Sequence, residues 1–382
     1  MRIRRNVKYL TATEKTAFTN AVLALKTKPS VLHPGTSNRY DDYPETHMAA
    51  MMPGAGWAHR APAFFPWHRE LLLQFENDLQ AVDSSVTIPY WDWTDSALNP
   101  FTAGFLGGNG TGPNQKVMDG PFAFDGPHHW TINVKDSPSD PQFLQRDFGA
   151  DFTAPSLPSG PQVVTVQGVT PYDLYPWHDN TGAYRAQMEV NLHNLVHRYI
   201  GGTMGAMTSP NDPVFWLHHC NIDRLWAEWQ QLHPTAAPYQ PVTGAAAGQN
   251  LHDNMIFSAG PPAPWPGSTT PADVIDHIAL GYTYDWTVAK VPHIPLAAVR
   301  ILFGIINDAP GVFIGPDGKP HPVPGGPGDP VWAKLTPAQR DRVAASALIE
   351  ISSLISNTTA RADIQKATKS LTGPARVQRA TS

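Results

Sequence analysis

The sequence predicts a mainly α-helical protein, in which a four-helix bundle is wrapped by long loops rich in proline and glycine, with a few short strands. Three observations predict this class. Several segments show the helical periodicity of apolar residues. Apolar residues make up 41% of the 382 positions, which is enough for a folded core. The 39 prolines are about twice the usual share, so we expect them in ordered loops around that core.

Four segments carry the predicted bundle, and apolar residues recur along one face of each. These segments are residues 11–27, 67–82, 185–200 and 214–232. Thr13 is the expected N-cap of the first segment, because its side chain can accept a hydrogen bond from the first turn. Gly201 and Gly202 are expected to end the third segment.

Less regular segments connect and follow these helices. Residues 94–184 show almost no periodicity, and we expect a surface layer with short strands there, for example over residues 162–169. A short helix is expected near residues 271–280. The composition then shifts to proline and glycine, and we expect an arm followed by an amphipathic helix over residues 336–355.

Composition excludes several classes of protein. Cys220 is the single cysteine, so an intramolecular disulfide, a cysteine zinc finger and a cysteine-ligated iron–sulfur cluster cannot form. The formal net charge of −5 provides no basic excess for nucleic acid. No apolar run predicts a membrane span, and the basic N-terminus lacks the apolar stretch of a signal peptide. We therefore expect a cytoplasmic protein, or one that is exported with a helper protein.

Six of the 16 histidines stand at positions that suit metal binding. His193 and His197 are four residues apart, so a helix places both imidazoles on one face. Asn194 stands where the general-base glutamate of a zinc hydrolase would follow the first histidine, so this spacing does not match that class. His68 and His219 lie on the apolar faces of two other predicted helices.

The remaining two candidates, His47 and His59, come from the loop before the helix of His68. Taken alone, each of the six is compatible with a hydrogen-bonded residue of the core. Together they form an all-imidazole set, which suits copper, zinc, nickel or iron. Two metals with three histidines each keep open coordination positions for dioxygen or a substrate. His33 is an alternative to His47, because no rigid motif precedes His59.

Two long motifs resemble those of the tyrosinase family. Residues 59–76 are similar to the family's first copper motif, and residues 212–223 are similar to its second. Residues 89–93 and 193–204 also resemble the family, in the family's order. The resemblance covers roughly residues 1–286, where Tyr282-Thr283-Tyr284 is similar to the aromatic motif that ends the family's catalytic core.

The resemblance implies a bundle that holds two copper ions, with dioxygen as co-substrate. It implies His47, His59 and His68 as ligands of one copper ion, and His193, His197 and His219 as ligands of the other. In the pair His218-His219, the family motif has its ligand at the second histidine. Many relatives join a cysteine to a ligand through a thioether, and this chain has no cysteine at that place. Cys220 is expected to be a small buried residue.

The resemblance further implies an oxidoreductase that converts phenols, ortho-diphenols or both to ortho-quinones. Glu189 and Asn194 would hold a water molecule that accepts the proton of the phenol. Arg198 would steer an acidic substrate, or be an exposed helix arginine. At Ala206 and Met207 some relatives place a bulky residue over the copper, and Gly205 and Ala206 here imply an open site for phenols of moderate size.

Three alternatives to a phenol-oxidising enzyme are also compatible with the sequence. The first is a catechol or ortho-aminophenol oxidase without monophenolase activity, the second an oxygen carrier of haemocyanin type, and the third a zinc hydrolase. The expected partners are a small phenolic substrate and dioxygen, with a helper protein for copper delivery or export. The predicted domains are a tyrosinase-like dicopper catalytic domain over residues 1–290 and a C-terminal extension over residues 291–382.

Overall fold

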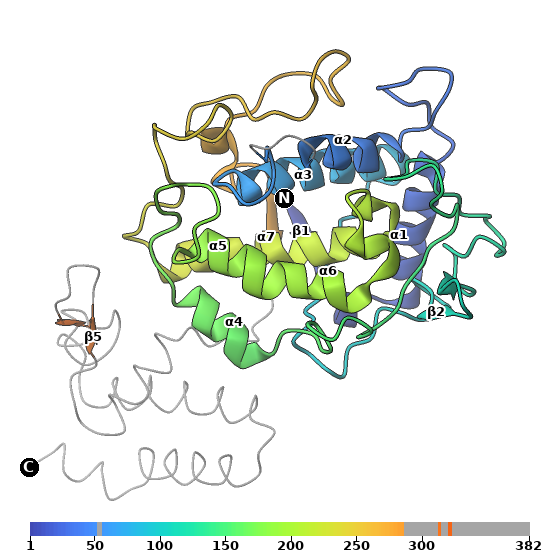
Figure 1. Ribbon diagram of the computed structural model, residues 1–382, viewed down its shortest axis with the longest axis horizontal. Coiled ribbons are helices and arrows are strands. Elements are labelled where there is room, and N and C mark those ends of the chain that lie inside the picture. The colour runs from blue at the N-terminus through green and yellow to red at the C-terminus, as the bar shows by residue number, and fades with distance from the viewer. Residues whose placement is uncertain (52–55, 286–311, 315–319, 323–382) are drawn as a thin grey trace, which may run out of the picture. The chain divides into compact units, whose positions relative to one another are not determined.

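Two long helices, α3 (Phe64–Val82) and α7 (Val214–Leu232), pack against each other at the centre of the computed structural model (Figure 1). Every residue of α7 from Val214 to Trp229 is buried, which is typical of a helix that runs through a core. The observed bounds of α7 are the predicted ones. Helix α3 begins three residues earlier than predicted, because Pro66 lies in its first turn, where no backbone N–H is needed for a helical hydrogen bond.

The structure describes residues 1–51, 56–285, 312–314 and 320–322. Residues Met1–Asp285 form one compact unit, and Trp286–Ser382 form a second. In the second unit, strands β5 (Val312–Ile314) and β6 (Pro320–Pro322) pair in antiparallel fashion. The helix predicted over residues 336–355 lies outside the described residues.

The other helices of the first unit are shorter and surround the central pair (Figure 1). They are α1 (Ala12–Leu25), α2 (Asp42–Met51), α4 (Gly160–Gln167), α5 (Tyr184–Met188) and α6 (Asn194–Ile200). A π turn, η2 (Glu189–His193), joins α5 to α6. The mainly α fold class is therefore confirmed. Among the described residues, no helix has both the length and the apolar composition needed to cross a membrane.

Two helices appear where the sequence predicted none, and capping explains one of them. The strand predicted over residues 162–169 is wrong, because helix α4 occupies this segment. Ser159 and Gln162 form a reciprocal capping box at its start, and Gly168 ends it. Helix α2 was predicted as loop, but Pro44 stands in its first turn and therefore does not interrupt it.

Two predicted helix boundaries are also wrong. The N-cap of α1 is Thr11 rather than Thr13, because the Thr11 hydroxyl accepts from the Glu14 amide while the Glu14 carboxylate accepts from the Thr11 amide. The helix predicted near residues 271–280 is a single 3₁₀ turn, η5 (Pro271–Val274). The carboxylate of Asp276 accepts the amide hydrogens of Ile278 and Ala279, which draws the chain into a turn instead of a helix.

The long segment between α3 and α4 forms a surface layer that is tied to the core by Arg146. It contains a small hairpin of strands β2 (Gly110–Thr111) and β3 (Lys116–Val117). The buried Arg146 guanidinium makes two hydrogen bonds of 2.7 and 2.8 Å to the carboxylate of Asp212, just before α7. It also donates to three backbone carbonyls of residues 106–108, so one side chain anchors the layer.

A buried ionic cluster closes the first unit. Strand β1 (Arg2–Arg4) pairs in parallel with β4 (Tyr282–Tyr284). This pairing brings Arg4 and the hydroxyls of Tyr282 and Tyr284 to the carboxylate of Asp223 on α7. Arg69 of α3 donates to the same carboxylate at 2.5 Å. Burial by itself raises the pKa of Asp223, but the two guanidiniums and two hydroxyls together hold that pKa below its ordinary value.

We predict that Asp223→Asn lowers the free energy of unfolding by about 3–5 kcal/mol, because the buried guanidiniums of Arg4 and Arg69 lose a shared counter-ion. Denaturant titration of the variant and the wild type measures this loss. The matched control is Asp125→Asn, which breaks an ion pair with Lys116 in which the aspartate is 53% exposed. We expect the control to lose at most about 1 kcal/mol. Equal losses in the two variants would contradict the prediction.

Candidate metal centre

The structure gathers seven histidines into two groups. Six of the seven are the metal ligands that the sequence predicts. The first histidine group comprises His47, His59 and His68. The second histidine group comprises His193, His197, His218 and His219. Within each group, one ring nitrogen of every member lies within 4.8 Å of the corresponding nitrogens of the others. His218 is the member that the sequence reasoning left out.

The two groups come from separate elements and adjoin where α3 meets α7. In the first group, α2 carries His47, α3 carries His68, and the loop before α3 carries His59. The rings of His68 and His219 stack across the two central helices with their centroids 4.4 Å apart. The alternative candidate, His33, lies elsewhere, on the surface, where its ring nitrogen bonds to Glu45.

Backbone carbonyls set the orientation of three imidazoles. The Nδ1 atoms of His47, His68 and His197 each lie 2.7 Å from a carbonyl oxygen, of Met207, Phe64 and Met204 respectively. Because a carbonyl oxygen only accepts hydrogen bonds, Nδ1 must carry the hydrogen and Nε2 must carry a lone pair. This is the tautomer of a histidine that coordinates a metal through Nε2.

The inward-facing nitrogens lack the partners that buried polar atoms normally have. Among the described residues, no group bonds to Nε2 of His47 or His68, although both atoms are buried. Nε2 of His219 lies 3.2 Å from Nε2 of His193 and 3.2 Å from Nε2 of His197. With Nδ1 of His197 carrying its hydrogen, Nε2 of His197 contributes only a lone pair. A cation shared by the nitrogens of one group would give their lone pairs a partner. The set of nitrogen donors therefore fits a metal such as copper or zinc.

Burial keeps the imidazoles neutral. It lowers the pKa of His47 to about 3 and the pKa of His197 to about 4. For His59, His68 and His219, burial and the neighbouring imidazoles hold the pKa well below its ordinary value. At neutral pH the groups therefore present uncharged nitrogen lone pairs, which is the form that binds a metal ion.

Glu189, on the π turn that also carries His193, accepts hydrogen bonds from two arginine residues. One carboxylate oxygen accepts the amide hydrogen of Arg60 at 2.6 Å, and the other accepts from the Arg185 guanidinium at 3.0 Å. Arg60 follows His59 and has a left-handed backbone, with φ at 60°, so the carboxylate stabilises a strained residue beside a histidine of the first group. Burial raises the pKa of Glu189, against the opposing effect of Arg185.

Two of the other predicted site residues, Asn194 and Met207, contact a histidine. The side-chain oxygen of Asn194 lies 2.8 Å from Nδ1 of His193. Arg198 forms a half-exposed ion pair with Asp151. Ala206 lines a cavity of about 380 Å³. Met207 provides the carbonyl that orients His47, a role that no sequence signal could have indicated because every residue has a carbonyl.

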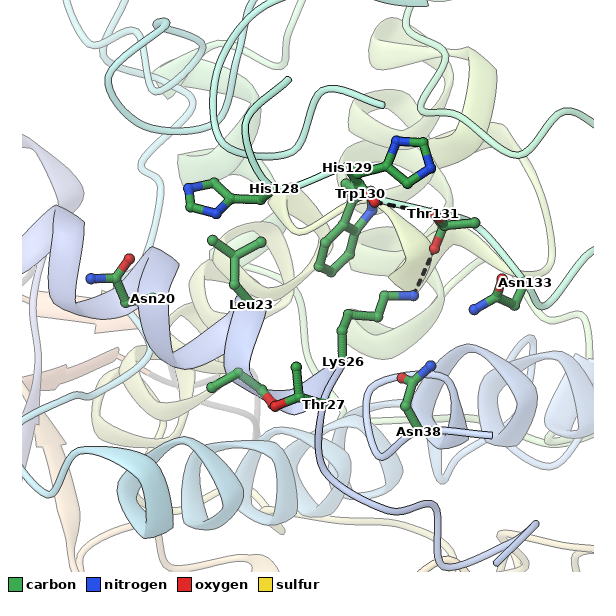
Figure 2. Close-up of a pocket in the computed structure, with 11 residues that line it drawn as sticks. Asn20, Leu23, Lys26, Thr27, Asn38, His128, His129, Trp130, Thr131 and Asn133 are labelled. Carbon is green, nitrogen blue, oxygen red and sulfur yellow. Dashed lines mark hydrogen bonds between the residues drawn. The ribbon is translucent and has the colours of Figure 1, made fainter. Parts of the chain in front are cut away.

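A separate cavity of about 600 Å³ lies beside α1 (Figure 2), and none of the seven grouped histidines lines it. Its lining includes two further histidines, His128 and His129, but neither belongs to a metal-binding group of the described residues. Figure 2 shows Lys26 within this wall, where its ammonium donates to the Thr131 carbonyl at 2.8 Å. The cavity therefore adds no ligand to the candidate metal centre.

Comparisons with known proteins match most of the first unit. Residues 37–232 match the family profile described as the common central domain of tyrosinase. The tyrosinases of Streptomyces glaucescens and Streptomyces antibioticus are each 42% identical to the chain, over 75% of this chain and 99% and 100% of theirs. Grixazone synthase of Streptomyces griseus is 35% identical over 74% of this chain and 99% of its own length. The structure of a polyphenol oxidase mutant from Thermothelomyces thermophila is similar with a TM-score of 0.54 and 27% identity, over 74% of this chain and 88% of that one.

We predict that the metal-free protein loses stability steeply as the pH falls from 6.5 towards 4. The folded imidazoles have pKa values below the ordinary value of about 6.5, so the unfolded chain binds more protons in this range and is favoured as the pH falls. Each buried imidazole contributes up to about 1.4 kcal/mol per pH unit. Denaturation midpoints at several pH values measure the slope.

The control for this prediction is His219→Phe, which removes one buried imidazole and keeps a ring beside Phe215. Its stability should depend less steeply on pH than that of the wild type. A wild-type protein whose stability is constant between pH 6.5 and 5 would contradict the prediction, because the ordinary carboxylates titrate mainly below this range.

Proposed function

The chain belongs to the tyrosinase family, and from this premise we propose that it uses dioxygen to convert phenols and ortho-diphenols to ortho-quinones. Membership of the family makes it a type 3 copper oxidase, a copper oxidoreductase of the tyrosinase and catechol oxidase type. The observation that carries the proposal is the pair of adjoining, neutral histidine groups. Among the described residues, Nε2 of His47 and His68 has no protein partner in the first group, and in the second group Nε2 of His219 faces those of His193 and His197.

Six histidines would hold the two metal ions in this proposal. His47, His59 and His68 would hold one copper ion, and His193, His197 and His219 would hold the other. Bound copper would supply the one-electron steps with dioxygen that no protein side chain provides. All six residues lie within residues 1–290, which we propose as the catalytic domain, with residues 291–382 as an extension outside it.

Glu189 and Asn194 would handle the proton of the substrate. A phenol must lose its hydroxyl proton before its oxygen can bind a metal ion, and a buried carboxylate is a suitable acceptor. Each oxygen of Glu189 accepts one hydrogen bond from the protein and has a second lone pair for a water molecule. Asn194 directs its oxygen to His193, so its amide hydrogens are available to hold that water beside the second group.

Substrate size and charge would be set at the rim of the second group. Gly205 has no side chain and Ala206 only a methyl group, and both line the same cavity, so neither would obstruct a phenol of moderate size. Met207 would contribute mainly through its backbone. Arg198 would attract an acidic substrate, whose carboxylate would compete with Asp151 for the guanidinium.

One observation favours a second candidate, an oxidase of catechols or ortho-aminophenols that does not hydroxylate monophenols. Arg185 forms an ion pair with the carboxylate of Glu189 and offsets part of the rise in pKa that burial causes. To that extent the ion pair would favour substrates that lose their proton more readily. The two candidates share the same metal centre and differ only in the range of substrates.

We predict that His68→Ala and His219→Ala each bind fewer than two copper ions per chain and lose more than about 100-fold in oxidase activity, because each loses a direct ligand. Copper analysis after reconstitution and the rate of ortho-quinone formation from catechol measure these losses. His33→Ala is the matched control, since His33 lies outside both groups, and it should keep two copper ions and full activity. If either test variant kept both copper ions and full activity, the ligand assignment would be wrong.

We predict that Glu189→Gln lowers kcat for a monophenol by about 100-fold or more, with a smaller loss for an ortho-diphenol, since an amide cannot accept the phenol proton. Copper content must stay at two ions per chain for the comparison to hold. Glu45→Gln, at the surface, is the control and should change neither rate. Equal losses for both substrates would count against Glu189 as the proton acceptor, and a wild type inactive on monophenols would favour the second candidate.

A further inference from the structure

One short segment provides a carbonyl oxygen to each histidine group. We call residues 203–208 the carbonyl segment. Its Met204 carbonyl accepts the Nδ1 hydrogen of His197 in the second group, and its Met207 carbonyl accepts that of His47 in the first group, both at 2.7 Å. Two carbonyls that lie three residues apart therefore orient one imidazole in each group.

The carbonyl segment is not held in place by regular secondary structure. Its first part belongs to a single 3₁₀ turn, η3 (Gly202–Gly205), and no helix or strand includes residues 206–208. At the start of the turn, Gly202 has φ at 51°, and a Cβ there would lie 2.2 Å from the Gln145 carbonyl oxygen. The segment therefore lies against the surface layer of residues 94–184 and depends on that layer for its position.

Two contacts with this layer fix the two ends of the carbonyl segment. At the Met204 end, the Thr203 amide donates to the Gln145 carbonyl at 2.9 Å, and the Gln145 amide donates to the Thr203 hydroxyl at 3.0 Å. At the Met207 end, the carboxylate of Asp136 accepts the amide hydrogens of Met207 and Thr208, at 2.7 and 3.0 Å. Asp136 is the one side chain that holds both of these consecutive amides, and it uses a different oxygen for each.

We propose that Asp136 is a positioning residue for the metal centre. Its charged carboxylate holds the peptide groups of Met207 and Thr208, so the Met207 carbonyl stays aimed at Nδ1 of His47. His47 in turn directs its Nε2 into the first histidine group. Asp136 does not touch a histidine and acts through the carbonyl segment. The proposal rests on the proposed function, in that the histidine groups must hold copper.

Because of where Asp136 lies, its substitution can change metal affinity without unfolding the protein. The residue is exposed and lies on the wall of the cavity that Ala206 also lines, so its substitution leaves no void in the core. Loss of a direct hydrogen-bond partner of a ligand imidazole typically weakens metal binding by about 10–100-fold. Because Asp136 acts one step further away, through the Met207 carbonyl, we expect its removal to have an effect at the lower end of that range. Asp136→Asn keeps one acceptor oxygen, and Asp136→Ala keeps none.

The test compares copper(I) affinity among the full-length, metal-free wild type, Asp136→Asn and Asp136→Ala, by competition with a chromophoric chelator. The matched control is Asp119→Asn, because the Asp119 carboxylate also accepts a backbone amide hydrogen in the surface layer, from Gly108 at 2.6 Å, without contact to the carbonyl segment. A second readout is the Nδ1–H signal of His47 in the ¹⁵N-histidine spectrum of the metal-free protein. The Nδ1–H signal of His68, which donates to the Phe64 carbonyl within α3, is its internal reference.

We expect a loss of about 10-fold in copper affinity for Asp136→Ala, a smaller loss for Asp136→Asn and none for Asp119→Asn. The His47 signal should shift or broaden while the His68 signal stays. Affinities of both Asp136 variants within twofold of wild type, or an equal loss in the control, would overturn the proposal. If Asp136→Ala fails to fold, Asp136→Asn decides alone. A wild type that binds no copper would refute the proposed function, and the His47 signal would still decide whether Asp136 positions the imidazole.

Discussion

The carboxylate of Asp223 is the point on which the architecture of the first unit depends. It is buried between the guanidiniums of Arg4 and Arg69, and two tyrosine hydroxyls complete its hydrogen bonds. Burying this charge is favourable only because all four donors meet it, so α3, α7 and the first strand must come together in one arrangement. Arg69 is the neighbour of His68, and Asp223 lies one helical turn after His219. The contact that neutralises the charge therefore also brings the two histidine groups together.

The candidate metal centre beside this ionic cluster differs from it, because the centre is formed by uncharged side chains. Its imidazoles are neutral, and those of His47, His68 and His197 bond through Nδ1 to backbone carbonyls rather than to carboxylates. A carbonyl fixes the tautomer and the direction of the ring without adding negative charge next to a metal site. The carboxylates of Asp223 and Glu189, which lie on the same elements as His219 and His193, are each paired with arginine. The chain thus keeps its ion pairs next to the centre and its uncharged donors within it.

Much of this arrangement could be predicted from the sequence, and the misses have physical causes. The central helices have dense apolar periodicity, so α7 was predicted with its observed bounds. The spacing of His193 and His197 predicts that both imidazoles lie on one face of their helix. Helix α2, which carries His47, begins with polar residues and a proline, so its pattern resembles a loop. The roles of Met204 and Met207 were not readable, because they use backbone atoms that every residue has. His218 was left out because the family motif has its ligand at the second histidine of the pair, whereas in the structure the ring of His218 stacks on that of His193.

The pairing of β1 with β4 has a consequence for how the protein is made. The first four residues find their partners about 280 positions later, at Tyr282–Tyr284. During synthesis, Arg4 and Asp223 therefore emerge from the ribosome well before the two hydroxyls that complete their cluster. Until then α3 and α7 can associate only while the carboxylate of Asp223 between them lacks two of its hydrogen-bond donors. The histidine groups would thus reach their final alignment only when nearly the whole first unit has left the ribosome exit tunnel. A metal ion would therefore bind late during synthesis of the chain.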